Sequence, residues 1–234
     1  MMKLLVTGAN RGLGLHVTKL ALEGGHHVIA GVRQAQLEAD ELRELKERYP
    51  IHLMVVPLDV KNEQSVQAAS EHVRQSLGQV DAIVNNAAIL VARDQKLEQL
   101  SLEQLEETFQ VNLYGPIRVA KHFLPLMVGN GEKAIINISS EAGSFANAYG
   151  GDYPYALSKG ALNLFSEHVR RYVADRSIRV YAVHPGWIRT DMGGNEAPGD
   201  PYEAARGVLA LVDGSNCPND AGVFINSRGE PMDL

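Results

Sequence analysis

The chain has 234 residues, 45% of them hydrophobic and 21% charged, with a formal net charge of −6. These values are typical of one soluble globular domain, and the acidic balance argues against a broad nucleic-acid or anionic-membrane surface. A single cysteine, Cys217, excludes an internal disulfide framework. The sequence contains no Cys/His cluster, so we do not expect a structural zinc site.

The N-terminal apolar run is too short for a signal peptide, and no stretch is long enough to cross a bilayer. A lone cysteine suits a reducing compartment. We therefore expect a cytoplasmic protein with no membrane partner and no nucleic-acid partner.

Short apolar runs alternate with helical patterns along the whole chain. The expected strands are Lys3–Val6, His27–Val32, His52–Val56, Ala82–Asn85, Ala134–Ile138, Arg179–Val183 and Val223–Ile225. The expected helices are Leu13–Glu23, Gln36–Arg48, Glu63–Leu77, Leu102–Val128, Tyr155–Ala174 and Pro201–Val212. Asn62 and Ser101 are expected to act as N-caps. Uninterrupted apolar strands that alternate with helices predict a single α/β domain over 1–234, doubly wound in the Rossmann manner, with a seven-stranded parallel sheet and helices on both faces.

A glycine-rich turn follows the first expected strand, with the sequence Val6-Thr7-Gly8-Ala9-Asn10-Arg11-Gly12-Leu13-Gly14. Glycines here permit a tight turn and a close approach of backbone to a ligand, and the N–H groups of the following helix can bind phosphate. The spacing G-x-x-x-G-x-G differs from the common G-x-G-x-x-G fingerprint. A plain turn is the alternative, but the position at the start of a strand–helix series favours a dinucleotide site.

The end of the second expected strand indicates which dinucleotide is bound. An NAD site usually places a carboxylate here to bond the ribose 2′-hydroxyl, whereas this chain has Gly31-Val32-Arg33. Arg33 and Arg11 are therefore expected to hold a 2′-phosphate, which favours NADP(H). The alternative is that both arginines are ordinary surface charges.

Three further stretches fall at the carboxyl ends of expected strands, where open α/β sheets bind ligands. Asp59 follows the third strand and either meets the adenine or caps a turn. Asn85, Asn86 and Ala87 end the fourth strand and either contact the cofactor or shape a turn. Ser139-Ser140 ends the fifth strand, and one hydroxyl is expected to face the reacting centre.

Tyr155 and Lys159 are four residues apart and share one face of an expected helix. Free tyrosine has a pKa near 10, which makes it a poor proton donor and acceptor at neutral pH. A neighbouring ammonium stabilises the phenolate, so we expect Lys159 to lower the pKa of Tyr155. A tyrosine and a lysine with no chemical role are the alternative for this spacing taken alone.

Taken in order, these motifs resemble the short-chain dehydrogenase/reductase family, in its single-domain branch. The matching motifs are Thr7-Gly8-x-x-x-Gly12-x-Gly14, Asp59-Val60, Asn85-Asn86-Ala87, Asn112, Ser139-Ser140, Tyr155-x-x-x-Lys159 and Pro185-Gly186. Within the family, the glycine turn and the stretch from His184 to Met192 are most similar to the C-factor and sniffer-type carbonyl reductases.

The resemblance implies a catalytic set of Asn112, Ser140, Tyr155 and Lys159. Tyr155 would be the general acid, Lys159 would lower its pKa and bond the nicotinamide ribose, and Ser140 would hold the carbonyl oxygen. Asn112 would take part in a proton relay through a water; a locally satisfied helix residue is the alternative. The residues expected to bind NADP(H) are Gly8, Asn10, Arg11, Gly12, Leu13, Gly14, Arg33, Asp59, Val60, Asn86, Ala87, Tyr155, Lys159, Pro185, Gly186, Trp187, Ile188 and Thr190.

The chain departs from the family pattern at two places. Position 88 is alanine where the family commonly has glycine, a small change for a turn. Ser140 lies 15 residues before Tyr155, whereas the family spacing is usually 13, and the glycine-rich stretch 147–152 can absorb the extra length. Ser140 is the expected catalytic hydroxyl, with Ser144 as the alternative.

We therefore expect a reductase that transfers hydride from NADPH to a small-molecule ketone or aldehyde. The stretch 192–200 is expected to be a mobile lid or a plain surface loop. By family analogy, the helices Leu102–Val128 and Tyr155–Ala174 are expected to form a homodimer or homotetramer interface. The alternative function is a signalling or regulatory protein of the C-factor type that binds NADP(H) with little turnover.

Overall fold

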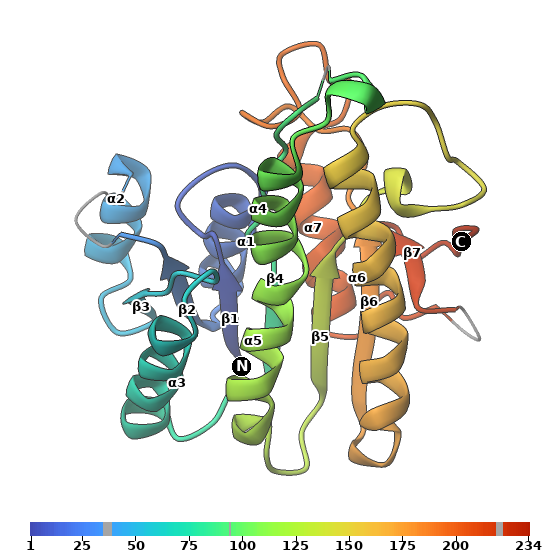
Figure 1. Cartoon of the computed structure of the whole chain (residues 1–234). Helices are drawn as coiled ribbons and strands as arrows, with labels where there is room; N and C mark the ends of the chain where they lie inside the picture. The colour runs from blue at the N-terminus through green and yellow to red at the C-terminus, as the bar shows by residue number, and fades with distance from the viewer. Residues whose placement is uncertain (35–38, 94, 219–221) are drawn as a thin grey trace.

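The computed structural model describes residues 1–34, 39–93, 95–218 and 222–234. Within these ranges seven parallel strands form one sheet in the order β3-β2-β1-β4-β5-β6-β7 (Figure 1). Their bounds are β1 Lys3–Thr7, β2 His27–Val32, β3 Leu53–Pro57, β4 Ala82–Asn85, β5 Lys133–Ile138, β6 Ile178–His184 and β7 Phe224–Asn226. The predicted doubly wound α/β fold is confirmed.

Helices cover both faces of the sheet (Figure 1). The α-helices are α1 Gly12–Glu23, α2 Asp40–Arg48, α3 Glu63–Leu77, α4 Leu102–Asn112, α5 Tyr114–Phe123, α6 Tyr153–Tyr172 and α7 Pro201–Val212. Short 3-10 helices are η2 Leu97–Gln99, η3 Leu124–Leu126, η4 Glu141–Gly143 and η5 Ala174–Arg176. None of the described helices is long and apolar enough to cross a membrane.

Two hydrophobic clusters lie on opposite faces of the sheet. One packs side chains of α1, α2 and α7 against alternate strand residues such as Val6 and Val84. The other packs α3, α5 and α6 against the intervening residues, such as Leu5 and Ile83. Because successive strand side chains point to opposite faces, central strands covered on both sides must be apolar at nearly every position, as their sequences are.

The order of the strands reverses between β1 and β4, which pair side by side in the middle of the sheet. The chain moves outward in one direction through β2 and β3, and in the other through β5, β6 and β7. In doubly wound sheets the crevice beyond the strand ends at such a point is where ligands bind. The glycine turn after β1 and the asparagines at the end of β4 lie together there.

The single helix expected over Leu102–Val128 is wrong, because the structure divides it into α4, α5 and η3. Leu113 separates the first two helices with φ −115° and ψ −58°. Pro116 has no amide hydrogen, so it cannot complete the α-helical bond to the Asn112 carbonyl four residues earlier. The break leaves that carbonyl oxygen outside the regular helical ladder.

Most other boundaries agree with the prediction to within about two residues. Asn62 and Ser101 accept hydrogen bonds from the backbone N–H groups of Ser65 and Gln104, so both predicted N-caps are confirmed. Helix α6 begins earlier than expected, at Tyr153, with Pro154 in its first turn. The first residues of the expected helix Gln36–Arg48, at 36–38, lie outside the described residues.

Candidate functional site

Helix α6 places Tyr155 and Lys159 against the end of β5. Lys159 Nζ is buried, lies 5.4 Å from the centre of the Tyr155 ring and donates a hydrogen bond to the Ile138 carbonyl at 2.7 Å. Ser140, two residues beyond Ile138, is a hydrogen-bonding neighbour of the Tyr155 hydroxyl. The expected tyrosine, lysine and serine therefore meet at the carboxyl edge of the sheet.

The neighbouring serines have other partners. Ser139 donates to Asn163 Oδ1 at 2.5 Å, in the interior between β5 and α6. Ser144 is buried, donates to the Asp233 carbonyl at 2.7 Å and accepts from the Ala146 N–H. Of the three serines, Ser140 is the one whose hydroxyl interacts with Tyr155.

The expected lowering of the Tyr155 pKa is wrong for the protein without cofactor. Burial raises the pKa of Tyr155 to about 12, and the Ser140 hydroxyl opposes this rise. Burial also lowers the pKa of Lys159 to about 7, so near neutral pH the lysine is only partly protonated. The desolvation of both groups outweighs their mutual attraction, because each charged form has lost its contact with water.

Asn112 is buried at the end of α4, and its side chain has local partners. Its Oδ1 accepts from Ile89 N–H at 2.9 Å, while its Nδ2 donates to the Ile89 carbonyl at 2.9 Å and to Ser158 Oγ at 3.1 Å. Ser158 in turn donates to the Tyr155 carbonyl at 2.7 Å. Asn112 thus ties the segment after β4 to the first turns of α6, and these contacts match the alternative of a locally satisfied helix residue.

The glycine turn is held by the end of β4. Asn86 Nδ2 donates to the carbonyls of Thr7 and Gly8 at 3.0 and 3.1 Å, and the N–H groups of Asn86 and Ala87 donate to Thr7 Oγ1. A Cβ on Gly14 would lie 2.4 Å from the Gly8 carbonyl oxygen, so only glycine fits there. Asn86 and Ala87, predicted to contact the cofactor, are here engaged in shaping the turn.

The start of α1 is suited to a phosphate group. Gly8 has φ +65°, and Gly12 is the first residue of α1. The helix has no side-chain N-cap bond and no acidic residue in its first turn, so none of its own carboxylates competes with a phosphate for these N–H groups. Of the other predicted residues of the turn, Leu13 is buried and Asn10 Oδ1 accepts from the Ala39 N–H at 2.6 Å.

The two predicted phosphate arginines are both exposed, and within the described ranges only Arg11 has an ion-pair partner. Arg11 Nη1 lies 2.9 Å from Asp191 Oδ2, in the segment after β6. Arg33 directly follows β2 and forms no ion pair with any residue that the structure describes. The backbone before it is joined to the glycine turn, since the N–H groups of Gly8 and Ala9 donate to the Gly31 carbonyl.

Asp59 and Val60 lie in the turn between β3 and α3. Asp59 Oδ1 accepts from the Lys61 N–H at 2.9 Å, and the Asp59 N–H donates to Ser65 Oγ. Val60 is buried, and its carbonyl accepts from Arg118 at 3.0 Å. These contacts match the alternative in which Asp59 caps a turn, and they do not use Asp59 Oδ2.

The segment after β6 folds back on itself at the same edge of the sheet. Gly186 has φ +90°, and Ile188 is buried and pairs with Gly199 in a short parallel bridge. Trp187 Nε1 donates to the Gly193 carbonyl at 2.8 Å, and Thr190 Oγ1 accepts from the Gly193 N–H at 3.2 Å. The stretch 192–200, expected as a lid or a surface loop, is a compact hydrogen-bonded turn.

Two charged residues near Tyr155 were not predicted. Arg93 donates to the Met192 carbonyl at 2.9 Å, and its charge lowers the pKa of Tyr155. Asp152, in a left-handed conformation with φ 46°, accepts from Tyr149 Oη at 2.8 Å and raises the pKa of Tyr155. Asp152 precedes Tyr155 by three residues, so helical spacing was an available signal; nothing in the sequence places Arg93.

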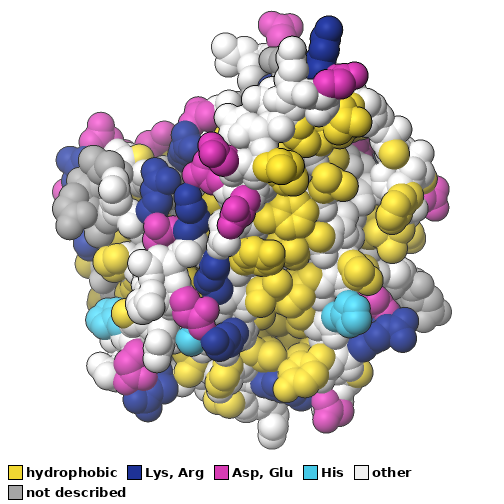
Figure 2. Space-filling model, in the orientation of Figure 1, with side chains coloured by type: hydrophobic (Ala, Val, Ile, Leu, Met, Phe, Trp, Pro, Cys, Tyr) yellow, Lys and Arg dark blue, Asp and Glu magenta, His cyan; other side chains and the backbone are white. Residues whose placement is uncertain are grey.

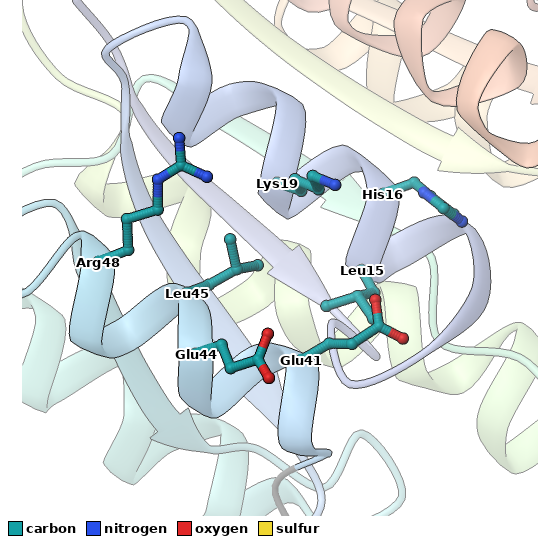
Figure 3. Close-up of a pocket in the computed structure, with 7 residues that line it drawn as sticks. All are labelled: Leu15, His16, Lys19, Glu41, Glu44, Leu45 and Arg48. Atoms are coloured by element: carbon teal, nitrogen blue, oxygen red, sulfur yellow. The ribbon is translucent and has the colours of Figure 1, made fainter.

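A cavity of about 150 Å³ lies elsewhere, between α1 and α2 (Figure 3). His16 and Lys19 come from α1, while Glu41, Glu44 and Arg48 come from α2. The lining contains none of the predicted site residues, and its charges are of both signs. The described residues contain no group of three or more His, Cys, Asp and Glu side chains that could hold a metal ion.

Comparisons with known proteins agree with this geometry. The model of the family described as short chain dehydrogenase matches residues 3–200. A 3-oxoacyl-(acyl-carrier-protein) reductase of Pseudomonas aeruginosa is 36% identical over 209 residues, which cover 88% of this chain and 81% of the relative. The C-signal of Myxococcus xanthus is 33% identical over 153 residues, covering 65% of this chain and 91% of the relative. The crystal structure of NADPH-bound carbonyl reductase from chicken fatty liver superposes with a TM-score of 0.90 at 32% identity, covering 100% of this chain and 99% of that one.

Proposed function

The chain belongs to the short-chain dehydrogenase/reductase family of oxidoreductases, and from this premise we propose that it is an NADPH-dependent carbonyl reductase. Its substrate is a small ketone or aldehyde, which it reduces to the alcohol. The observation that carries the proposal is the meeting of Ser140, Tyr155 and Lys159 at the sheet edge, beside the glycine turn.

The residues present fit a dinucleotide phosphate. The glycine turn is closed by Asn86, and the N-terminus of α1 is free of capping side chains and acidic residues. Arg11 and Arg33 supply two guanidinium groups at the ends of β1 and β2, suited to a 2′-phosphate. The backbone from Pro185 to Thr190 faces the same edge and would hold the nicotinamide end. When bound, NADPH supplies the hydride for the carbonyl carbon.

The side chains of this protein handle the proton. Tyr155 Oη donates its proton to the carbonyl oxygen as negative charge develops there, and Ser140 Oγ donates a hydrogen bond to the same oxygen. Loss of the proton leaves a phenolate that a charged Lys159 stabilises. A high pKa keeps Tyr155 protonated at neutral pH, which is the state that reduction requires.

Replacement of Tyr155 by Phe tests the proposal. NADPH consumption is measured against a panel of aldehydes, ketones, quinones and diketones, and Tyr155→Phe is expected to lower turnover by about 10²- to 10⁴-fold, the usual contribution of a positioned acid. Tyr153→Phe, two residues earlier on the same helix, is the matched control and is expected to retain turnover. NADPH binding, measured by fluorescence, is expected to persist in both variants.

A regulatory function is the second candidate, and the similarity to the C-signal of Myxococcus xanthus favours it. In that case the protein binds NADP(H) with micromolar affinity, yet consumes none with any carbonyl in the panel. Retained turnover in Tyr155→Phe would instead mean that the proton comes from another group.

We also propose that the protein is a homodimer or homotetramer that works in the cytoplasm, the latter because its one cysteine suits a reducing compartment. An apolar groove of about 660 Å³ runs between α5 and α6, with Ile117, Leu124, Phe165 and Tyr172 among its lining residues. Figure 2 shows hydrophobic side chains gathered in a continuous stripe on this face. A second copy that presents the same helices would cover the stripe.

A further inference from the structure

Two buried hydrogen bonds between an amide and a hydroxyl join the β5 segment to helix α6. Ser139 Oγ donates to Asn163 Oδ1 at 2.5 Å, and Asn137 Nδ2 donates to Ser166 Oγ at 2.8 Å. All four side chains are at most 1% exposed. The hydroxyl is the donor in the first bond and the amide is the donor in the second. Both bonds join the β5 segment to α6, but only the first lies next to Ser140.

The side chain of Asn163 contacts both ends of the short segment that carries Ser140. Its Oδ1 accepts from Ser139, on one side of Ser140, and its Nδ2 donates to the Gly143 carbonyl at 3.3 Å, on the other side. Between these contacts, Ser140 Oγ accepts from the Ala142 N–H at 3.2 Å. One amide thus fixes the two ends of the five-residue stretch 139–143.

The same stretch packs directly on the turn of α6 that carries Lys159. A Cβ on Gly143 would lie 2.6 Å from Gly160 N and 2.6 Å from the Lys159 carbonyl carbon, so the two backbones are in contact. Lys159 Nζ adds its bond to the Ile138 carbonyl. Ser140 and Tyr155 belong to these two elements, so their separation depends on how the elements are joined.

We propose that Asn163 is a positioning residue, which together with Ser139 fixes the Ser140 hydroxyl against the Tyr155 hydroxyl. The inference rests on the proposed reductase function. Asn163 lies four residues beyond Lys159, on the same face of α6, and acts through Ser140 without touching the substrate. The Asn137–Ser166 bond has no such role, because neither of its residues borders Ser140.

Two serine substitutions separate positioning from stability. Ser139→Ala and Ser166→Ala delete the same atom from equally buried sites. Both are expected to lower the melting temperature, Ser166→Ala by at least as much because Ser166 Oγ also donates to the Leu162 carbonyl at 2.7 Å. Ser139→Ala and Asn163→Ala are expected to lower kcat for carbonyl reduction about 10- to 100-fold, the scale of a small misplacement at a reacting centre. Ser166→Ala is expected to keep the wild-type kcat, and NADPH affinity is expected to be unchanged in all three.

The double variant Ser139→Ala/Asn163→Ala is expected to be about as slow as Asn163→Ala alone, since each substitution removes the same Ser139–Asn163 hydrogen bond. The pH dependence of alcohol oxidation with NADP⁺ is a second measurement, and it would not change if Ser139 and Asn163 only stabilised the fold. Oxidation requires deprotonated Tyr155, and Ser140 lowers its pKa. Ser139→Ala is therefore expected to move the acidic limb to higher pH, and Ser166→Ala to leave it in place.

Crystal structures of Ser139→Ala and Ser166→Ala decide the inference independently of turnover. The distance from Ser140 Oγ to Tyr155 Oη is expected to increase in Ser139→Ala and to stay the same in Ser166→Ala. An unchanged distance in both, or equal loss of kcat in both, would overturn the positioning role. An inactive wild-type protein would instead contradict the reductase function, while the two crystal structures would still test the geometry.

Discussion

Burial acts in opposite directions on the two titratable groups of α6. It raises the pKa of Tyr155 to about 12 and lowers that of Lys159 to about 7, because in both cases the neutral form is favoured. The protein without cofactor therefore holds a neutral phenol and a lysine that is readily deprotonated. Anionic phosphates bound nearby would favour the charged lysine, so binding of NADP(H) and the charge of Lys159 are expected to be coupled.

The buried lysine makes stability depend on pH. An unfolded lysine keeps its proton up to about pH 10.5, whereas the folded protein releases that of Lys159 near pH 7, so the unfolded state binds more protons between these values. The free energy of unfolding of wild type relative to Lys159→Met is therefore expected to rise with pH across this window, by at most about 1.4 kcal/mol per pH unit. Denaturant unfolding at several pH values measures the slope. Lys19→Met, at an exposed position on α1, is the control and should follow wild type.

The proposed preference for NADPH over NADH rests on two arginines, Arg11 and Arg33. Removal of a charged hydrogen bond costs roughly 1.5–3 kcal/mol, so Arg33→Ala is expected to raise the KM for NADPH about 10- to 100-fold. The KM for NADH, which lacks the 2′-phosphate, is expected to stay the same. Steady-state kinetics with both cofactors check this, and an equal change for both would mean that Arg33 does not contact that phosphate.

Backbone contact between η4 and α6 is the element-scale feature on which the site depends. A methyl group on Gly143 must displace one of the two segments, so Gly143→Ala is expected to destabilise the protein by about 1–3 kcal/mol and to impair turnover. Gly131→Ala is the matched control, because a Cβ there meets nothing within 4 Å. Thermal unfolding and NADPH consumption compare the two variants. Equal stability would show that η4 shifts without cost.

The strands and most helices were predictable because sheet burial and helix periodicity act locally in the sequence. The prediction of one helix over Leu102–Val128 was wrong because it followed the amphipathic periodicity and gave too little weight to Pro116. Pro116 has no N–H to donate to the Asn112 carbonyl, so the helical hydrogen bonds are interrupted there. The proximity of Ser140, Tyr155 and Lys159 was predictable from the order of the family motifs along the chain. The contacts of Asn163, Arg93 and Asp191 could not be predicted, since each joins segments that are separated in the chain.

At the scale of the whole molecule, one side of the sheet carries more exposed apolar surface than a monomer needs. On α6, Leu157, Leu164 and Tyr172 are spaced along one face and are 55%, 62% and 74% exposed. Tyr172 also lines the groove between α5 and α6, on the face where Figure 2 shows a hydrophobic stripe. Burying this stripe against a second copy would remove it from water without changing the sheet.

Tyr172→Glu is expected to dissociate the proposed oligomer at micromolar concentration, because it places a charge on an exposed residue that lines the apolar groove. Ile51→Glu is the control, since Ile51 is 80% exposed but lies outside the groove. Analytical ultracentrifugation of both variants and the wild type measures the molecular mass. A monomeric wild type at micromolar concentration would contradict the proposed interface.

The Arg11–Asp191 ion pair joins the first turn of the fold to the segment that follows β6. A dinucleotide phosphate that binds Arg11 would compete with a carboxylate already bound to Nη1 of the guanidinium, so we expect binding to involve an exchange of anions. The liberated Asp191 then faces solvent as an unpaired charge beside an incoming ligand of the same sign. Binding of NADP(H) is therefore expected to be slower, and less sensitive to salt concentration, than at a site whose arginine has no ion-pair partner.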